Sequence, residues 1–155
     1  MYKELVISII IVVSIFVLDY ITQKYTDNVI NEAIQNLNTI KLALKERKEE
    51  EEGLNEEENE TEEINEGEEE LEGLDEDEKI LKLASDNYEK WLKYHKRLAF
   101  YIEHNELEKV ETNYVTGKSF IENAKYEDAM SEVEKTIFVL QHINDKYSVN
   151  LENIF

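Results

Sequence analysis

Residues 5–18 read LVISIIIVVSIFVL, and Ser8 and Ser14 are the two members of this run that are not strongly apolar. With Ile21 the apolar stretch reaches 17 residues, or about 25 Å of helix, which is the short end of what spans a bilayer. Its Leu, Ile, Val and Phe side chains contribute about −4 to −7 kcal/mol to insertion. Asp19 lies near the end of the stretch, where a charge costs less than the roughly 3 kcal/mol of the bilayer centre. We therefore expect a transmembrane anchor over residues 1–21.

Two other interpretations of this run are a buried core helix and a cleaved signal peptide. The run is apolar on all faces, which disfavours a core helix, and no A-x-A-like cleavage site follows, because residues 19–24 read DYITQK. We expect an uncleaved, single-pass signal anchor. Lys3 and Lys24 flank the two sides almost equally, but the amino terminus adds a positive charge next to Lys3. The expected orientation therefore has a cytoplasmic amino terminus and an extracytoplasmic body.

The composition indicates an all-α protein with one modest domain. The chain has 155 residues, 37 acidic and 17 basic side chains, a net charge of −20, no cysteine, no proline and four glycines. Without cysteine there are no disulfides and no thiolate metal ligands. The shortage of proline and glycine favours long helices over a turn-rich β architecture.

Almost all of the net charge lies in residues 49–78, which hold 19 acids and no base, whereas residues 1–48 sum to +1 and residues 79–155 to −2. Like charges and few apolar side chains cannot offset the entropy of ordering, so this segment is predicted to be a mobile acidic linker. It is either a solvated linker or a site that collects Ca²⁺ or a basic protein. The nearly neutral remainder has no basic stripe, which argues against nucleic-acid binding.

Residues 22–48 are predicted to form an amphipathic helix that continues from the anchor or follows a break after it. Its apolar positions are spaced three and four apart. They are Ile30, Ala33, Leu37, Ile40 and Leu44.

Residues 79–155 are predicted to form the helical body, with three helices on short connections. The apolar stripe of the first helix is Leu81, Ala84, Tyr88, Trp91, His95, Leu98 and Ile102. The stripe of the second helix is Leu107, Val110, Tyr114, Gly117 and Ile121. The stripe of the third helix is Tyr126, Ala129, Val133, Ile137, Leu140 and Ile143 or Tyr147. Asn105 and Glu108 have the spacing of a capping box at the start of the second helix, and residues 123–125 form a turn. Residues 148–155 are predicted to be a non-periodic tail, which Leu151, Ile154 and Phe155 would pin against the body. The expected fold is an amino-terminal transmembrane helix followed by an antiparallel three- or four-helix bundle, interrupted by the disordered acidic loop.

Several segments resemble a family of small bacterial membrane-anchored proteins known as a domain of unknown function, number four-three-six-three. The segments are Trp91, residues 98–110 (LAFYIEHNELEKV), 126–129 (YEDA), 140–143 (LQHI) and 151–155 (LENIF). The resemblance covers residues 85–155 closely and 1–48 loosely, and it makes residues 49–78 look like an insertion. It implies one amino-terminal span and a helical body, and it suggests a multi-span membrane protein as partner. It implies no activity, cofactor or catalytic residue.

No motif for catalysis is present: there is no glycine-rich phosphate loop, nucleophile elbow or H-E-x-x-H sequence. His104 and His142, with Glu103 or Glu108, would bind Zn²⁺ if the helix ends met, but a turn residue and a charge near a helix end explain both histidines better. We therefore predict no catalytic, cofactor-binding or metal-binding residues, no cofactor and no small-molecule substrate.

An aromatic cluster on the first helix of the body is better explained by core packing than by a ligand site. Its members are Trp91, Tyr88, Tyr94, Phe100 and Tyr101. Tyr94 and Tyr101 are the candidates for partner contact on the outer face. The predicted function is a non-enzymatic membrane-anchored interaction or scaffolding module, and the alternative is a cation- or basic-protein-binding module acting through residues 49–78.

Overall fold

The computed structural model describes residues 2–51, 53 and 74–147, and all regular structure in this part of the chain is helical. The helices are α1 (Tyr2–Glu51), α2 (Glu76–Leu98), α3 (His104–Glu122) and α4 (Tyr126–Tyr147). The all-α prediction is confirmed. Of the two predicted forms, a three- or a four-helix bundle, the structure has the four-helix form, because the second half of α1 packs with the three helices that follow. The predicted packing of residues 148–155 and the predicted mobility of residues 54–73 lie outside the described residues.

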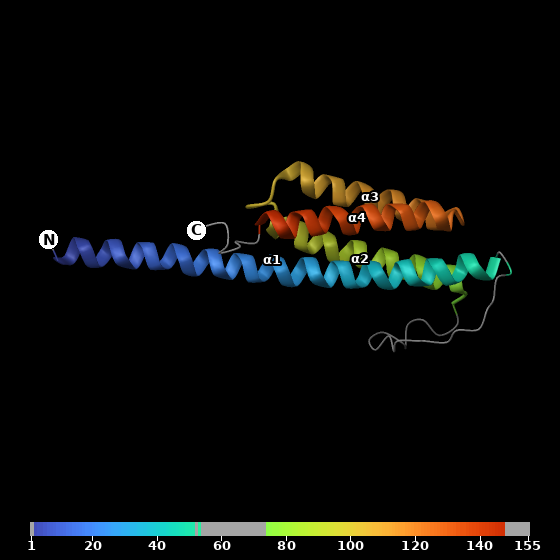
Figure 1. Ribbon diagram of the computed structural model, residues 1–155, viewed down its shortest axis with the longest axis horizontal. Coiled ribbons are helices and arrows are strands. Elements are labelled where there is room, and N and C mark those ends of the chain that lie inside the picture. The colour runs from blue at the N-terminus through green and yellow to red at the C-terminus, as the bar shows by residue number, and fades with distance from the viewer. Residues whose placement is uncertain (1, 52, 54–73, 148–155) are drawn as a thin grey trace.

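The helices form an antiparallel bundle in which each helix packs against two neighbours. Helix α1 contacts α2 and α4, and α3 contacts the same two helices. Successive helices run in opposite directions, and the amino-terminal half of α1 projects beyond the bundle (Figure 1). The end of the bundle from which this half projects is called the proximal end below, and the opposite end the distal end.

The second half of α1 enters the core with the predicted stripe. All five predicted positions, Ile30, Ala33, Leu37, Ile40 and Leu44, are buried. No break separates them from the apolar run, because α1 is a single helix through both. If the apolar half of α1 moved along its axis or rotated about it, the helical body would therefore move with it.

Helix α2 differs from its predicted stripe at three points. It ends at Leu98, and Ile102 is buried from the loop that follows rather than from the helix. Ile80 takes the buried position assigned to Leu81, and the polar Asn87 is buried beside the stripe. In α4 the same kind of one-residue difference buries Thr136 instead of Ile137, and the Thr136 hydroxyl donates to the Glu132 carbonyl at 2.7 Å.

The predicted capping box at Asn105 is wrong. Helix α3 begins earlier, at His104, and the Glu103 carbonyl accepts from the amides of Glu106 and Leu107 at 3.0 and 3.3 Å. Glu103 makes no side-chain cap, so Asn105 lies inside the first turn. A capping box is present at the start of α2 instead, where Asp75 and Glu78 exchange backbone and side-chain hydrogen bonds.

The turn predicted over residues 123–125 is confirmed. Ala124 has a φ of +51°, in the left-handed region that non-glycine residues rarely adopt. The amide of Lys125 donates to the Phe120 carbonyl at 2.9 Å, which satisfies a carbonyl at the end of α3. This tight connection makes α3 and α4 antiparallel neighbours.

Candidate functional site

The apolar half of α1 is the most conspicuous surface of the described protein. Its large apolar side chains between Leu5 and Leu18 are 50 to 70% exposed and contact no other helix. Soluble monomers rarely expose contiguous apolar patches of more than a few hundred Å². In the described residues, one helix is long and apolar enough to cross a membrane, and it lies near the amino terminus with its apolar window unburied.

At the proximal end of the bundle, three contacts that involve tyrosines join α1 to the end of α2 and the loop after it. The Tyr101 hydroxyl and Thr26 Oγ1 are hydrogen-bonded at 3.0 Å, and the Arg97 guanidinium lies 5.8 Å from the centroid of the Tyr25 ring. Tyr94, one turn before the end of α2, donates its hydroxyl to Glu32 Oε2 at 2.8 Å. This carboxylate, together with burial, raises the pKa of Tyr94 to about 12.

These contacts change the assignment of the aromatic cluster. Tyr94 and Tyr101, the predicted partner-contact residues, are half-buried and bind α1 within the chain. Trp91 packs in the core, stacked on Tyr114 with ring centroids 6.2 Å apart. Phe100, which we assigned to core packing, is 88% exposed. The sequence contains the signal for this: the stripe that passes through Leu98 and Ile102 leaves Phe100 on the opposite side.

A cluster of ion pairs closes the proximal end between α3 and α4. Lys146 Nζ donates to Glu103 Oε1 and Glu106 Oε1, both at 2.9 Å, and the Tyr147 hydroxyl accepts from the Glu103 amide at 3.0 Å. Glu106 is buried, and the two carboxylates raise the pKa of Lys146 well above its usual value, Glu106 most strongly. An ammonium group thus occupies the position between the carboxylates.

The structure gives the histidines separate acidic partners. His104 Nε2 lies 3.1 Å from Glu108 Oε1, and His142 Nε2 lies 3.8 Å from Glu106 Oε1. His95 Nδ1 is 3.3 Å from Glu111 Oε2. Within residues 2–51, 53 and 74–147, no group of three His, Asp or Glu side chains is arranged to hold a metal ion. The zinc arrangement of His104 and His142 with Glu103 or Glu108 is therefore not formed by these side chains.

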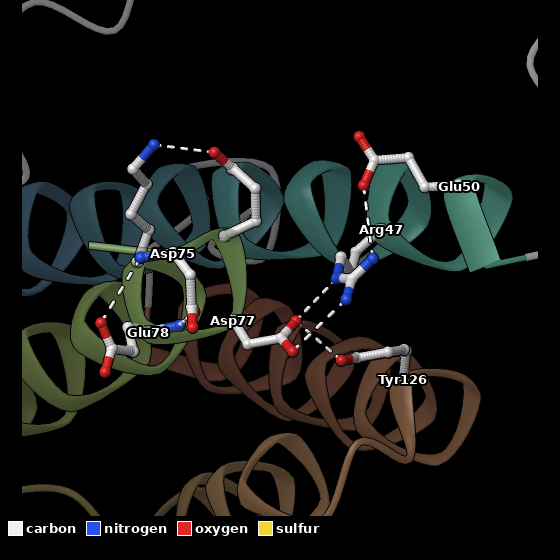
Figure 2. Close-up of polar contacts among 8 residues, drawn as sticks. Arg47, Glu50, Asp75, Asp77, Glu78 and Tyr126 are labelled. Carbon is white, nitrogen blue, oxygen red and sulfur yellow. Dashed lines mark hydrogen bonds and ion pairs between the residues drawn. The ribbon is translucent and has the colours of Figure 1, made fainter. Parts of the chain in front are cut away.

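The distal end of the bundle carries a second polar cluster, which joins three helices. Arg47 at the end of α1 donates through Nε to Asp77 Oδ1 at 2.7 Å and through Nη2 to Asp77 Oδ2 at 3.4 Å. Tyr126, the first residue of α4, donates its hydroxyl to Asp77 Oδ1 at 2.7 Å. Figure 2 shows both groups converging on this carboxylate. Arg47 and Tyr126 hold the pKa of Asp77 below its usual range.

The distal cluster also defines the ends of the acidic segment. Helix α1 runs on to Glu51 and α2 begins at Glu76, so both ends of residues 49–78 are helical. The pair of Arg47 with Asp77 links these ends. The expected cation- or protein-binding residues between them lie mostly outside the described part of the chain.

A groove runs along the outer face of α3 and α4. It has a volume of about 480 Å³ and contains Phe138, which is 71% exposed. The other lining residues are Lys109, Asn113, Ser131, Glu134, Lys135 and Val139. No sequence pattern predicts this groove, although the positions of Phe138 and Lys135 off the α4 stripe are consistent with their exposure. Aromatic residues such as Phe138 are enriched at protein interfaces, and charged residues such as the two lysines and the glutamate are found at their polar rims.

The fold and its exposed apolar helix define a helical-bundle protein in which one helix of the described residues is suited, by length and composition, to crossing a membrane. The family model described as "Domain of unknown function (DUF4363)" matches residues 54–154, and the chain belongs to this family. The resemblance found from the sequence is thereby confirmed. The match includes most of the acidic segment, which does not support the expectation that residues 49–78 are an insertion, and it leaves out residues 1–53. No curated protein and no solved structure matches the chain.

Proposed function

We propose that the protein is a non-enzymatic, membrane-anchored interaction module. In this proposal residues 1–21 span the cytoplasmic membrane, the amino terminus is cytoplasmic, and the bundle binds a multi-span membrane protein on the outer face. The observation that carries the proposal is the continuity of α1, which is one helix from the exposed apolar run into the bundle core. A body joined to the span in this way stays beside the bilayer, where a membrane protein is the partner within reach.

The α3–α4 groove is the proposed contact surface for this partner. Phe138 supplies an aromatic anchor, and Lys109, Lys135 and Glu134 add charged groups around it, with Lys135 paired to Glu132 at 2.6 Å. Interfaces are enriched in aromatic side chains at their centre and are polar at their rim. The histidines and the buried Glu106 lie at the proximal end and do not line the groove, which favours binding over catalysis as its role.

The test is photo-crosslinking in intact membranes, with the photoreactive residue at position 138. Val115 is the matched control, because it is also an exposed apolar residue, 51% exposed, but lies on α3 outside the groove. We expect an adduct with a multi-span protein from position 138 that Lys135→Glu weakens, and none from position 115. Equal labelling from both positions, or adducts with lipid alone, would contradict the proposal.

The alternative function, binding of cations or a basic protein by residues 49–78, is favoured by the Arg47–Asp77 pair, which holds the two ends of the acidic segment together. Replacing residues 54–73 with a short glycine-serine linker separates the two functions. Loss of the position-138 adduct in this variant would favour the acidic segment as the binding element. An unchanged adduct would remove the alternative.

A further inference from the structure

The loop between α2 and α3, residues 99–103, lies at the proximal end of the bundle, on the side from which the apolar half of α1 projects (Figure 1). Phe100 in this loop is 88% exposed, more than any other large apolar side chain among the described residues. Its neighbours Leu98 and Ile102 are buried and Tyr101 is bonded to α1, so the loop is fixed while Phe100 points away from the core. The loop therefore presents one aromatic side chain outward from a rigid support.

The contacts of the loop place it at the depth of the lipid headgroups if α1 spans the bilayer. Tyr101 is bonded to Thr26, which lies five residues, or about 7.5 Å of helix rise, beyond Ile21. The polar layer of a bilayer is roughly 5–8 Å thick on each side of a hydrocarbon core of about 30 Å. Because the apolar stretch is only about 25 Å long, hydrophobic mismatch draws the body closer to the bilayer.

The charge around the loop suits an anionic surface. Residues 93–101 read KYHKRLAFY and hold three cations and no acid, in a chain with a net charge of −20. Within the part of the chain that the structure describes, Lys93 and Lys96 have no ion-pair partner. The Arg97 guanidinium makes a cation–π contact with the Tyr25 ring. Two acids near the loop, Glu103 and Glu106, share Lys146 as an ion-pair partner, which offsets one of their two negative charges.

We propose that this loop is a second membrane contact, in which Phe100 enters the boundary between headgroups and acyl chains and Lys96 and Arg97 bind phospholipid phosphates, preferring anionic lipid. The contact rests on the proposed anchoring by α1. A single helix leaves the body free to rotate about the span, whereas a second contact fixes that rotation. The α3–α4 groove then faces a defined direction beside the membrane, which is what binding a membrane partner requires.

The test uses the full chain reconstituted in vesicles that contain lipid brominated near the headgroup, with phosphatidylglycerol as the anionic component. Phe100→Trp places the reporter in the loop, and Phe138→Trp is the matched control. Phe138 is also an exposed aromatic residue, but it lies nine residues, or about 13 Å of helix rise, from the end of α4 that faces the membrane. The wild-type chain, whose Trp91 is buried, gives the background emission.

We expect the Phe100→Trp emission to be quenched about twofold more than that of Phe138→Trp, because interfacial aromatics sit roughly 5–10 Å into the headgroup boundary. Flotation with the vesicles is measured on the same samples. A chain that fails to float would overturn the anchor, and this contact with it. Equal quenching of the two variants in a chain that floats would overturn this contact alone.

The preference for anionic lipid has its own readout. In vesicles without phosphatidylglycerol the quenching of Phe100→Trp should fall, and adding Lys96→Gln and Arg97→Gln should remove the difference between the two lipid compositions. The matched charge control is Lys118→Gln with Lys125→Gln, at the opposite end of the bundle, which should leave the difference in place. Lipid-independent quenching of Phe100→Trp would contradict the role of the two cations.

Discussion

Replacing Asp77 by asparagine tests the distal cluster that joins α1, α2 and α4. Asparagine has the same shape and keeps an oxygen to accept from Tyr126, so the change chiefly removes the charge that Arg47 binds at 2.7 and 3.4 Å. The Arg47 side chain is 27% exposed and that of Asp77 44%, which places the pair at the upper end of the range for solvent-screened ion pairs. We expect the free energy of unfolding at pH 7 to fall by about 1 kcal/mol.

The stabilisation by Asp77 should depend on pH, and the direction of its pKa shift fixes the direction of this dependence. The pKa of Asp77 is lowered in the folded protein by Arg47 first and Tyr126 second, from an unfolded value of about 3.9. Its stabilisation is therefore fully present above about pH 4 and is lost as the pH falls through the folded pKa. The unfolding free energies of the wild type and of Asp77→Asn should converge below about pH 4.

The assay is urea titration of the full chain in detergent, followed by the fluorescence of Trp91. This residue is the one tryptophan of the chain and is buried in the bundle, so its emission reports the body and not the span. Glu76→Gln is the control, because it removes the same charge from the first turn of α2. Among the described residues Glu76 pairs with Lys79 of its own helix and with no other helix. Equal unfolding free energies of Asp77→Asn and the wild type at pH 7 would refute the reasoning. So would a difference between them that stays constant below pH 4.

Three further predictions concern the core, the proximal end and the span. Leu140→Ala, at a fully buried position of α4, should lower the free energy of unfolding in urea by about 3 kcal/mol, because a cavity replaces its contacts. Tyr101→Phe should cost about 1 kcal/mol in the same titration by removing the hydroxyl that bonds to α1. The double variant Ile10→Lys with Val13→Lys adds about 5–7 kcal/mol against an insertion energy of similar size, so fractionation should find it outside the membrane. Its tryptophan emission should match the wild type, because neither position contacts the body.

The sequence predicted the second half of α1 well because one physical feature controls it. A stripe spaced three and four apart has a single way to face a core, and Ile30 to Leu44 follow that stripe into the bundle. Helix α2 was predicted less accurately, because adjacent apolar residues such as Ile80 and Leu81 compete for one buried position. The buried Asn87 has no signal in a pattern that counts only apolar positions.

The polar contacts were less predictable because they depend on residues distant in sequence. Arg47 and Asp77 are 30 residues apart along the chain. The run of like charges between them contains no pattern that would show which residue of α2 lies beside Arg47. Asn105 had the right spacing for a cap, yet α3 begins earlier because its first turn is fixed from α4 by Lys146 and Tyr147. Tertiary contacts thus decided the helix start that local sequence had assigned elsewhere.

The measurement that tests the membrane-anchored module most directly is protease treatment of intact cells, followed by alkaline extraction of their membranes and sequencing of the protein's amino terminus. The account predicts that untreated protein stays in the washed membranes with residues 1–21 uncleaved, and that external protease removes the helical body. Protein released by the alkaline wash, an amino terminus that begins after residue 21, or a body protected from protease in intact cells but digested after lysis would contradict it.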